Sequence, residues 1–197
     1  MAKTAQGAAA PTDRAPGKRA RLVQAAKDLL YEQGVERTTL AEVAARADVP
    51  PGNVYYYFKT KDDLVEAAIA SQREDVESTL AGLEAHRTPK ARLRALVRVF
   101  IDAREQVARS GCPQGSLCSE LDKRGDRLSD ACGELMRIPI SWAERQFAEM
   151  GRRDAPELAV ALIAGYQGAA LLANTFRDPD LLAGEGKRLE RWIDGLS

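Results

Sequence analysis

The sequence predicts an all-α fold, with a small three-helix head ahead of a larger helical body. Apolar residues recur at three- and four-residue spacings along most of the chain, which is the period of an amphipathic helix. No run in the body alternates between apolar and polar residues as a half-buried strand does. The chain has 197 residues, 45% of them hydrophobic, so it can bury one sizeable core.

Residues 1–17 precede the first predicted helix. They are rich in Ala, Gly, Pro and Thr without an apolar period, so we expect a flexible arm. They also lack the apolar run of a signal peptide, which favours a cytoplasmic protein. The formal net charge of the chain is zero, but Met1–Lys27 contains six Lys or Arg and one acidic residue, a charge of +5. This stretch would either approach phosphate groups or remain a solvated tail.

The predicted head spans residues 18–62. Its first helix is indicated by apolar residues at helical spacing that stop at Gly34: Leu22, Val23, Ala26, Leu29 and Leu30. Thr39 and Glu42 then have the T-x-x-E spacing of a capping box, which predicts the start of a second helix. Asp48-Val49-Pro50 interrupts that helix, and Pro51 suits the first position of a third.

The third helix is predicted to have one inward and one outward side. Successive residues turn by about 100°, so Val54 and Phe58 share one side, and Asn53, Tyr56 and Tyr57 share the opposite one. Exposed tyrosines are costly unless their hydroxyls bind phosphate oxygens or base edges. The pattern therefore predicts a DNA-binding helix-turn-helix, and the alternative is a structural helical hairpin with packed tyrosines.

A fourth helix follows directly. Thr60 and Asp63 have the spacing of a second cap, which places Lys61 in the first helical turn beside the third helix. A cation at that position can bind a phosphate.

The stretch AAKDLLYEQGVERTTLAEVAARADVPPGNVYYYFKTKDDLVEAAI resembles the amino-terminal domain of the tetracycline-repressor (TetR) family of transcriptional regulators. The aromatic run followed by K-x-K-x-x-L is the most specific part of the resemblance. Pro50-Pro51 departs from the family, which usually has a polar helix cap there. The resemblance implies a homodimeric repressor that a small-molecule effector releases from a palindromic double-stranded DNA operator.

Within this interpretation, the third helix would enter the major groove. Asn53 would contact a base edge, the tyrosines would contact phosphates or thymine methyl groups, and Gly52 would permit close backbone approach. Thr39 and Lys61 would fix the register on phosphates. The predicted DNA-binding residues are Thr38, Thr39, Gly52, Asn53, Tyr55, Tyr56, Tyr57 and Lys61.

The body, residues 63–197, is predicted to bind the effector and to form the dimer. Helices are expected from Leu64 to about Glu84, from Pro89 through Val107, over residues 116–122, and from Asp126 to about Met150 with a kink at Pro139. Candidate residues of an effector pocket are Phe100, Arg104, Leu117, Leu121, Leu135, Met136, Ile140, Trp142, Phe147, Tyr166, Gln167 and Leu171.

The last two predicted helices suggest association. Leu158–Thr175 is apolar nearly all round, while Leu182, Leu189 and Leu196 recur every seven residues, with Trp192 and Ile193 beside them. We expect a homodimer through these helices, with an intramolecular core as the alternative. The apolar stretch from Leu158 is predicted to be too short to span a membrane, so no membrane partner is expected.

The remaining features predict neither an enzyme nor a metalloprotein. There is one histidine, His86, and the spacing of Cys112, Cys118 and Cys132 matches no zinc pattern, so no metal and no cofactor is expected. Cys112 precedes a predicted helix amino terminus, where a thiolate is favoured, so it is a candidate redox residue. The alternative function is therefore a dimeric ligand or thiol-redox sensor that acts through a protein partner.

Overall fold

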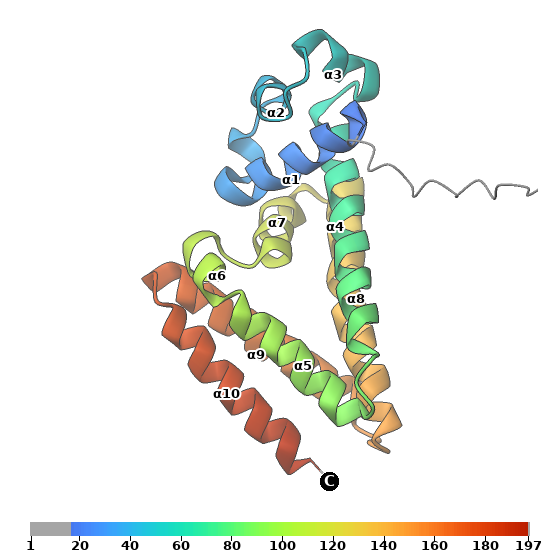
Figure 1. The fold of residues 1–197 in the computed structure, drawn as a ribbon, viewed down its shortest axis with the longest axis vertical. Coiled ribbons are helices and arrows are strands. Elements are labelled where there is room, and N and C mark those ends of the chain that lie inside the picture. Colours follow the sequence, from blue (N-terminus) through green and yellow to red (C-terminus); the bar gives the residue numbers. More distant parts are fainter. Residues whose placement is uncertain (1–16, 197) are drawn as a thin grey trace, which may run out of the picture.

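The computed structural model describes residues 17–196, and all the regular structure in that range is helical (Figure 1), which confirms the predicted all-α fold. The predicted arm, residues 1–17, lies outside this range except for Gly17. In chain order the elements are α1 (Lys18–Arg37), α2 (Leu40–Arg46), α3 (Pro51–Tyr57), α4 (Lys61–Leu83), α5 (Pro89–Asp102), α6 (Arg104–Ser110), α7 (Pro113–Leu121), the short 3-10 helix η1 (Asp122–Arg124), α8 (Arg127–Glu149), α9 (Ala155–Phe176) and α10 (Pro179–Gly195).

The helices form a head and a body that share one long helix (Figure 1). α1, α2 and α3 lie together at one end of the molecule. α4 begins beside them and runs down into the body, where it packs against α8. α9 packs between α8 and α10, α5 lies against α10, and α7 contacts both α1 and α8. The head is thus joined to the body through α4 and through α7.

Local sequence sets where most helices begin. The predicted capping boxes are both present: Thr39 and Glu42 cap α2, and Thr60 and Asp63 cap α4. Asp126 caps α8 by accepting hydrogen bonds from the backbone N–H groups of Leu128 and Ser129. α3 has Pro51 at its first position and no side-chain cap, because Pro50 occupies the N-cap.

Gly34 interrupts α1 near its end, as predicted. It has φ +85° and ψ 171°, a conformation that other residues rarely adopt, and a last helical turn to Arg37 follows it. The hydroxyl of Thr38 donates a hydrogen bond to the carbonyl oxygen of Gly34 at 2.7 Å, which closes this turn.

Apolar side chains from all four amino-terminal helices form the core of the head. Leu22 of α1, Val43 of α2 and Val54 of α3 are almost completely buried, together with Phe58 and Leu64. Burial of side chains of this size contributes about 1.5–3 kcal/mol each, so this small core fixes the angle between α2 and α3.

The body differs from the prediction at several places, and α7 begins at Pro113 and not at Ser116. The helix that starts at Pro89 ends at Asp102, and Val107 belongs to a separate helix, α6. α9 has 22 residues, so the expectation that its apolar stretch is too short to cross a membrane was wrong on length. By length and composition α9 could span a bilayer, but core helices of soluble proteins pass the same test, and here α9 packs against α6, α8 and α10.

The leucines of α10 that repeat every seven residues face the core of the same chain. Leu182, Leu189 and Ile193 are nearly fully buried, and Trp192 packs beside Phe147 of α8 with the ring centroids 5.9 Å apart. The prediction that this face of α10 forms the dimer contact was therefore wrong, because these side chains hold α10 against α5 and α9.

Candidate nucleic-acid interface and ligand cavity

α3 presents one polar, aromatic face to solvent. Val54 and Phe58 anchor the helix in the head, and on the other side Tyr55 and Tyr56 are 57% and 77% exposed. Asn53 is half-buried on α3. The helix therefore has the two-sided character that the sequence predicted, and its exposed face carries hydroxyl and amide groups.

Tyr57 was predicted to face outward with Asn53 and Tyr56, and that prediction was wrong for Tyr57. It is half-buried and packs against the apolar core, and its ring stands edge-on to Tyr56 at 5.0 Å between centroids. Its packing orients the exposed ring of Tyr56. Tyr55 and Tyr56 are thus the tyrosines that are most available for a partner.

The two predicted threonines lie in different environments. Thr38 is only 3% exposed, and its hydroxyl is used within the turn after Gly34. Its side chain therefore stabilises the head and is not available to bind a ligand on the surface. Thr39 is exposed, and its hydroxyl accepts a hydrogen bond from the backbone N–H of Glu42 at 3.2 Å while capping α2.

Lysines lie on both sides of the start of α4. Lys61 Nζ donates to the carbonyl oxygen of Glu36 at 3.1 Å, which links α4 to the end of α1. Lys59 Nζ donates to the carbonyl oxygen of Tyr55 at 2.9 Å at the end of α3. A lysine ammonium has three N–H groups, so each keeps donors free for an anion. Lys59 was missed among the candidate residues, although it is the first lysine of the K-x-K run.

The turn between α2 and α3 contains a non-glycine residue in the left-handed region. Asp48 has φ +50°, and its carboxylate lies 3.6 Å from the guanidinium of Arg21. Aspartate tolerates this conformation better than most residues because its short side chain bonds locally. The turn therefore depends on the residue type at position 48.

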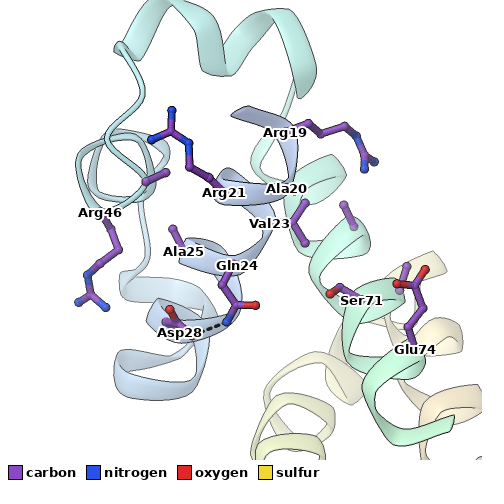
Figure 2. A pocket seen from close by; sticks show the side chains of 13 residues that line it. Arg19, Ala20, Arg21, Val23, Gln24, Ala25, Asp28, Arg46, Ser71 and Glu74 are labelled. Carbon is purple, nitrogen blue, oxygen red and sulfur yellow. Dashed lines mark hydrogen bonds between the residues drawn. The ribbon is translucent and has the colours of Figure 1, made fainter. Parts of the chain in front are cut away.

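A hollow of about 710 Å³ lies on the head, between α1, the end of α2 and α4. Figure 2 shows that three arginines around it, Arg19, Arg21 and Arg46, point in different directions. Arg46 forms two hydrogen bonds with Glu32, and Arg19 lies over the ring of Phe58. Since these cations do not converge, the hollow is a groove between helices and not an anion site.

A smaller cavity of about 200 Å³ lies inside the body. Its walls come from α4, α5, α7, α8 and α9, and the rings of Phe100 and Tyr166, which stack on each other with centroids 3.8 Å apart, form part of one wall. The lining residues are Gln72, Asp75, Val76, Thr79, Leu80, Leu96, Val99, Phe100, Ala103, Pro113, Gln114, Met136, Pro139, Ile163, Tyr166 and Gln167. An apolar wall with a few polar groups is typical of a small-molecule site.

Some of the predicted pocket residues reach this cavity. Phe100, Met136, Tyr166 and Gln167 line it, as does Pro139, which lies inside the continuous helix α8. The other predicted residues lie elsewhere. The core contains Leu117, Leu121, Leu135 and Phe147, and Ile140 packs beside it. Arg104 and Leu171 are outside the lining, and the indole N–H of Trp142 donates to Glu84 at 2.7 Å.

The contribution of α4 to the cavity was missed. Gln72, Asp75 and Thr79 recur at helical spacing and are polar, so the sequence alone makes them look like a solvated face. Their polar character was the only feature of the sequence that could have indicated a place in the cavity lining.

Cys112 is the N-cap residue of α7 and is 4% exposed. Its sulfur accepts hydrogen bonds from the backbone N–H of Gly115 and from Gln167 Nε2, each at 3.4 Å. Tyr31 lies nearby, and burial raises the pKa of its hydroxyl to about 12. The thiol also borders a hollow of about 430 Å³, but its burial limits direct access for an oxidant.

One side of α9 is apolar and uncovered. Leu171 and Phe176 are 67% and 66% exposed, and Val160 and Leu172 are also exposed. Between them the same side carries the small residues Ala161, Ala164 and Gly168. An exposed apolar stripe of this kind marks an association surface more often than a solvated one.

Comparison with known proteins agrees with this geometry. The amino-terminal sequence model described as "Bacterial regulatory proteins, tetR family" matches residues 22–68, which cover most of α1 to the first part of α4. The model described as "Tetracyclin repressor-like, C-terminal domain" matches residues 89–184, from α5 into α10. The chain belongs to the TetR family.

Relatives support this TetR assignment over nearly the whole chain. The HTH-type transcriptional regulator TtgR of Pseudomonas putida is 29% identical over 193 residues, covering 89% of this chain and 88% of TtgR. The regulatory protein TetR from Rhodobacter sphaeroides superimposes with a TM-score of 0.78 at 26% identity, over 88% of this chain and 97% of that one. A TetR regulator from Chloroflexus aurantiacus has the same fold, with a TM-score of 0.81 at 24% identity, over 90% and 94%.

The TetR assignment also decides the general class of the protein. Its relatives are transcriptional regulators, so this chain is a DNA-binding regulator and not an enzyme. Within residues 17–196, no group of three His, Cys, Asp or Glu side chains is arranged to hold a metal ion.

Proposed function

We propose that this regulator is a homodimeric repressor whose α3 enters the major groove of a two-fold symmetric DNA operator and whose body cavity takes a small-molecule effector. The observation that carries the DNA contact is the exposed face of α3, with Asn53, Tyr55 and Tyr56 on a helix that is anchored by buried Val54 and Phe58. A rigid helix with an exposed polar face can present side chains to base edges in the major groove.

The proposed contacts divide by type. Asn53 contacts a base edge, Tyr55 and Tyr56 contact phosphates or thymine methyl groups, and Gly52 allows the backbone to approach the DNA. Thr39, Lys59 and Lys61 bind phosphates. Thr38 is not among them because its side chain is buried, and Tyr57 acts by orienting Tyr56.

The proposed dimer forms through α9. The exposed apolar stripe with Val160, Leu171 and Phe176 would pack on its copy across a two-fold axis, and exposed Leu181 of α10 would extend the contact. A dimer also gives the protein a second α3. One short helix contacts few base pairs, whereas two copies contact two half-sites about 34–36 Å apart.

The proposed effector site is the cavity lined by Phe100 and Tyr166. An effector that binds more tightly to the conformation that does not fit the operator must weaken DNA binding, and DNA must weaken effector binding by the same factor. We place the protein in the cytoplasm, with the DNA that it regulates.

Selection from a random duplex pool at about 150 mM salt tests the DNA-binding proposal, because specific complexes are far tighter than non-specific ones at such salt concentrations. We expect a two-fold palindrome to be enriched. Asn53→Ala should relax the sequence preference and cost about 1–3 kcal/mol, while Lys61→Ala should weaken binding to all sequences alike. Ser78→Ala, an exposed change on α4 away from α3, is the matched control.

Two results would contradict the proposal. The folded protein could enrich no sequence, or both variants could bind every DNA as the parent does. Enrichment of no sequence would favour a sensor that acts through a protein partner. Unchanged DNA binding by both variants would show that the DNA contact does not lie on α3.

A further inference from the structure

The side chains that line the body cavity carry a net negative formal charge. Its lining contains one formally charged side chain, Asp75 of α4, and no lysine or arginine. A carboxylate or phosphate in the cavity would therefore lie near an acidic group, and no lysine or arginine of the lining would pair with the bound anion. This arrangement disfavours an anionic effector.

The rest of the lining suits a positive charge. Phe100 and Tyr166 form a stacked pair with an interplanar angle of 15°, and aromatic ring faces attract cations. Met136 adds a polarisable thioether, and Gln114 and Gln167 add polar amide groups to the same lining. The lining thus combines aromatic, thioether and amide groups with one carboxylate.

Asp75 already has a cationic partner, and that partner comes from the head. Lys27 of α1 forms an ion pair with Asp75 and also donates to the hydroxyl of Ser71 at 3.3 Å. The Lys27 side chain is 12% exposed, whereas that of Asp75 is 58% exposed. Asp75 therefore lies at the solvent-exposed edge of the cavity, where a second cation can reach its carboxylate, whereas Lys27 is largely buried and would keep its hydrogen bond to Ser71 if that cation replaced it.

We propose that the cavity binds a small organic cation, with Asp75 as its counter-ion and the Phe100–Tyr166 stack as its apolar wall, and that the bound cation replaces Lys27. This inference rests on the proposed role of the cavity as the effector site. Replacement of Lys27 removes one contact between α1 and α4. Binding of the effector would therefore loosen α1, which belongs to the head.

Calorimetric titration with two isosteric probes tests the charge preference. Phenyltrimethylammonium and tert-butylbenzene have nearly the same shape, but only the first is charged. We expect the parent protein to bind the cation at least tenfold more tightly than the hydrocarbon. Asp75→Asn should remove this difference. Glu74→Gln, an exposed change on the same helix that faces the groove on the head, should leave it intact.

A second variant tests the exchange with Lys27. Lys27→Met keeps the length of the side chain but removes the competing charge, so we expect the affinity for phenyltrimethylammonium to rise several-fold. A purely structural ion pair would give unchanged or weaker binding, and that result would overturn the exchange.

The inference is wrong if the parent does not bind the cation, or binds both probes equally. Its failure can be told apart from failure of the proposed function, because selection of DNA from a random pool by the parent protein uses neither probe and no variant of the cavity. If the parent enriches no DNA but prefers the cation, the cavity chemistry stands and the proposed function fails.

Discussion

The carboxylate of Glu120 accepts a hydrogen bond from the backbone N–H of Val35 at 2.6 Å. Glu120 belongs to α7 of the body, and Val35 follows Gly34 in α1 of the head, so this bond ties the two parts together. Two ion pairs lie on the same boundary, since Arg124 binds Asp62 and Arg127 binds Asp63 at the start of α4. The head is therefore held by specific polar contacts as well as by its apolar core.

Glu120→Ala should destabilise the protein by about 1–3 kcal/mol, because the N–H of Val35 loses its acceptor in a partly buried place. Glu120→Gln keeps an oxygen acceptor and should cost less. Urea unfolding measures both. Glu134→Gln, which changes an exposed carboxylate paired with Arg137 on α8, is the control. Equal stability of all three variants would show that the bond contributes nothing.

Gly34→Ala should destabilise by about 2 kcal/mol or more, because alanine is strained at a φ of +85°. Its Cβ would also lie 2.8 Å from the carboxylate oxygens of Glu120. Gly133→Ala is a matched control in α8, where the added Cβ meets no atom within 4 Å, and it should stabilise by about 0.5–1 kcal/mol. Thermal unfolding of both variants gives the comparison, and a loss of stability at both positions would contradict the role of backbone conformation.

Replacements at Asp48 should follow the demands of its left-handed backbone. Asp48→Gly should keep the free energy of unfolding within about 0.5 kcal/mol of the parent, since glycine accepts a φ of +50°. Asp48→Val should cost about 2 kcal/mol, because a β-branched residue is strained there. DNA binding by Asp48→Val should weaken as well, since α3 follows this turn. Equal losses of stability in both variants would show that the pair with Arg21, which both variants remove, matters more than the backbone.

Asp63 should make the stability of the head depend on pH. Its hydrogen bonds with Thr60, and then the guanidinium of Arg127, hold the pKa of Asp63 below its ordinary value of 3.8. A group with a lowered folded-state pKa stabilises the protein above its unfolded pKa and loses that contribution as the pH falls through the folded value. The difference in urea midpoint between the parent and Asp63→Asn should therefore be larger at pH 7 than near pH 3. Ser78→Ala, an exposed change in α4 of a side chain that does not titrate in this range, should show no such trend.

Leu171→Glu should separate the proposed dimer, because it places a charge on the exposed apolar side of α9. Sedimentation velocity should show a monomer that remains folded by circular dichroism. DNA binding should fall steeply, since two copies of α3 are no longer held together. Ala148→Glu, on an exposed side of α8, is the control. A dimer that survives Leu171→Glu would place the contact elsewhere.

The parts of the fold that depend on neighbouring residues could be predicted from the sequence. The capping boxes at Thr39 and Thr60 and the break at Gly34 are local, and each was correct. The inward side of α3, with Val54 and Phe58, also follows from helical period alone.

The parts of the fold that depend on residues far apart in the sequence could not be predicted in this way. Thr38 looks like a surface residue until the turn after Gly34 buries it, and the leucines of α10 fit an interface between copies as well as a core. Glu120 looks like part of a solvated helix face, because its partner Val35 lies 85 residues away in the sequence. The candidate cavity is likewise assembled from five helices, and no periodicity within one of them shows which side faces the others.

The continuity of α4 has a mechanical consequence. One unbroken helix carries Lys61 next to the proposed DNA-binding face and Asp75 at the edge of the cavity. At 1.5 Å per residue these positions are about 21 Å apart along the axis. A tilt of about 5° around the cavity end would therefore displace the head end by about 2 Å. In a two-fold dimer both heads would move, so the spacing of the two recognition helices would change by up to twice that amount while every hydrogen bond inside α4 stays intact.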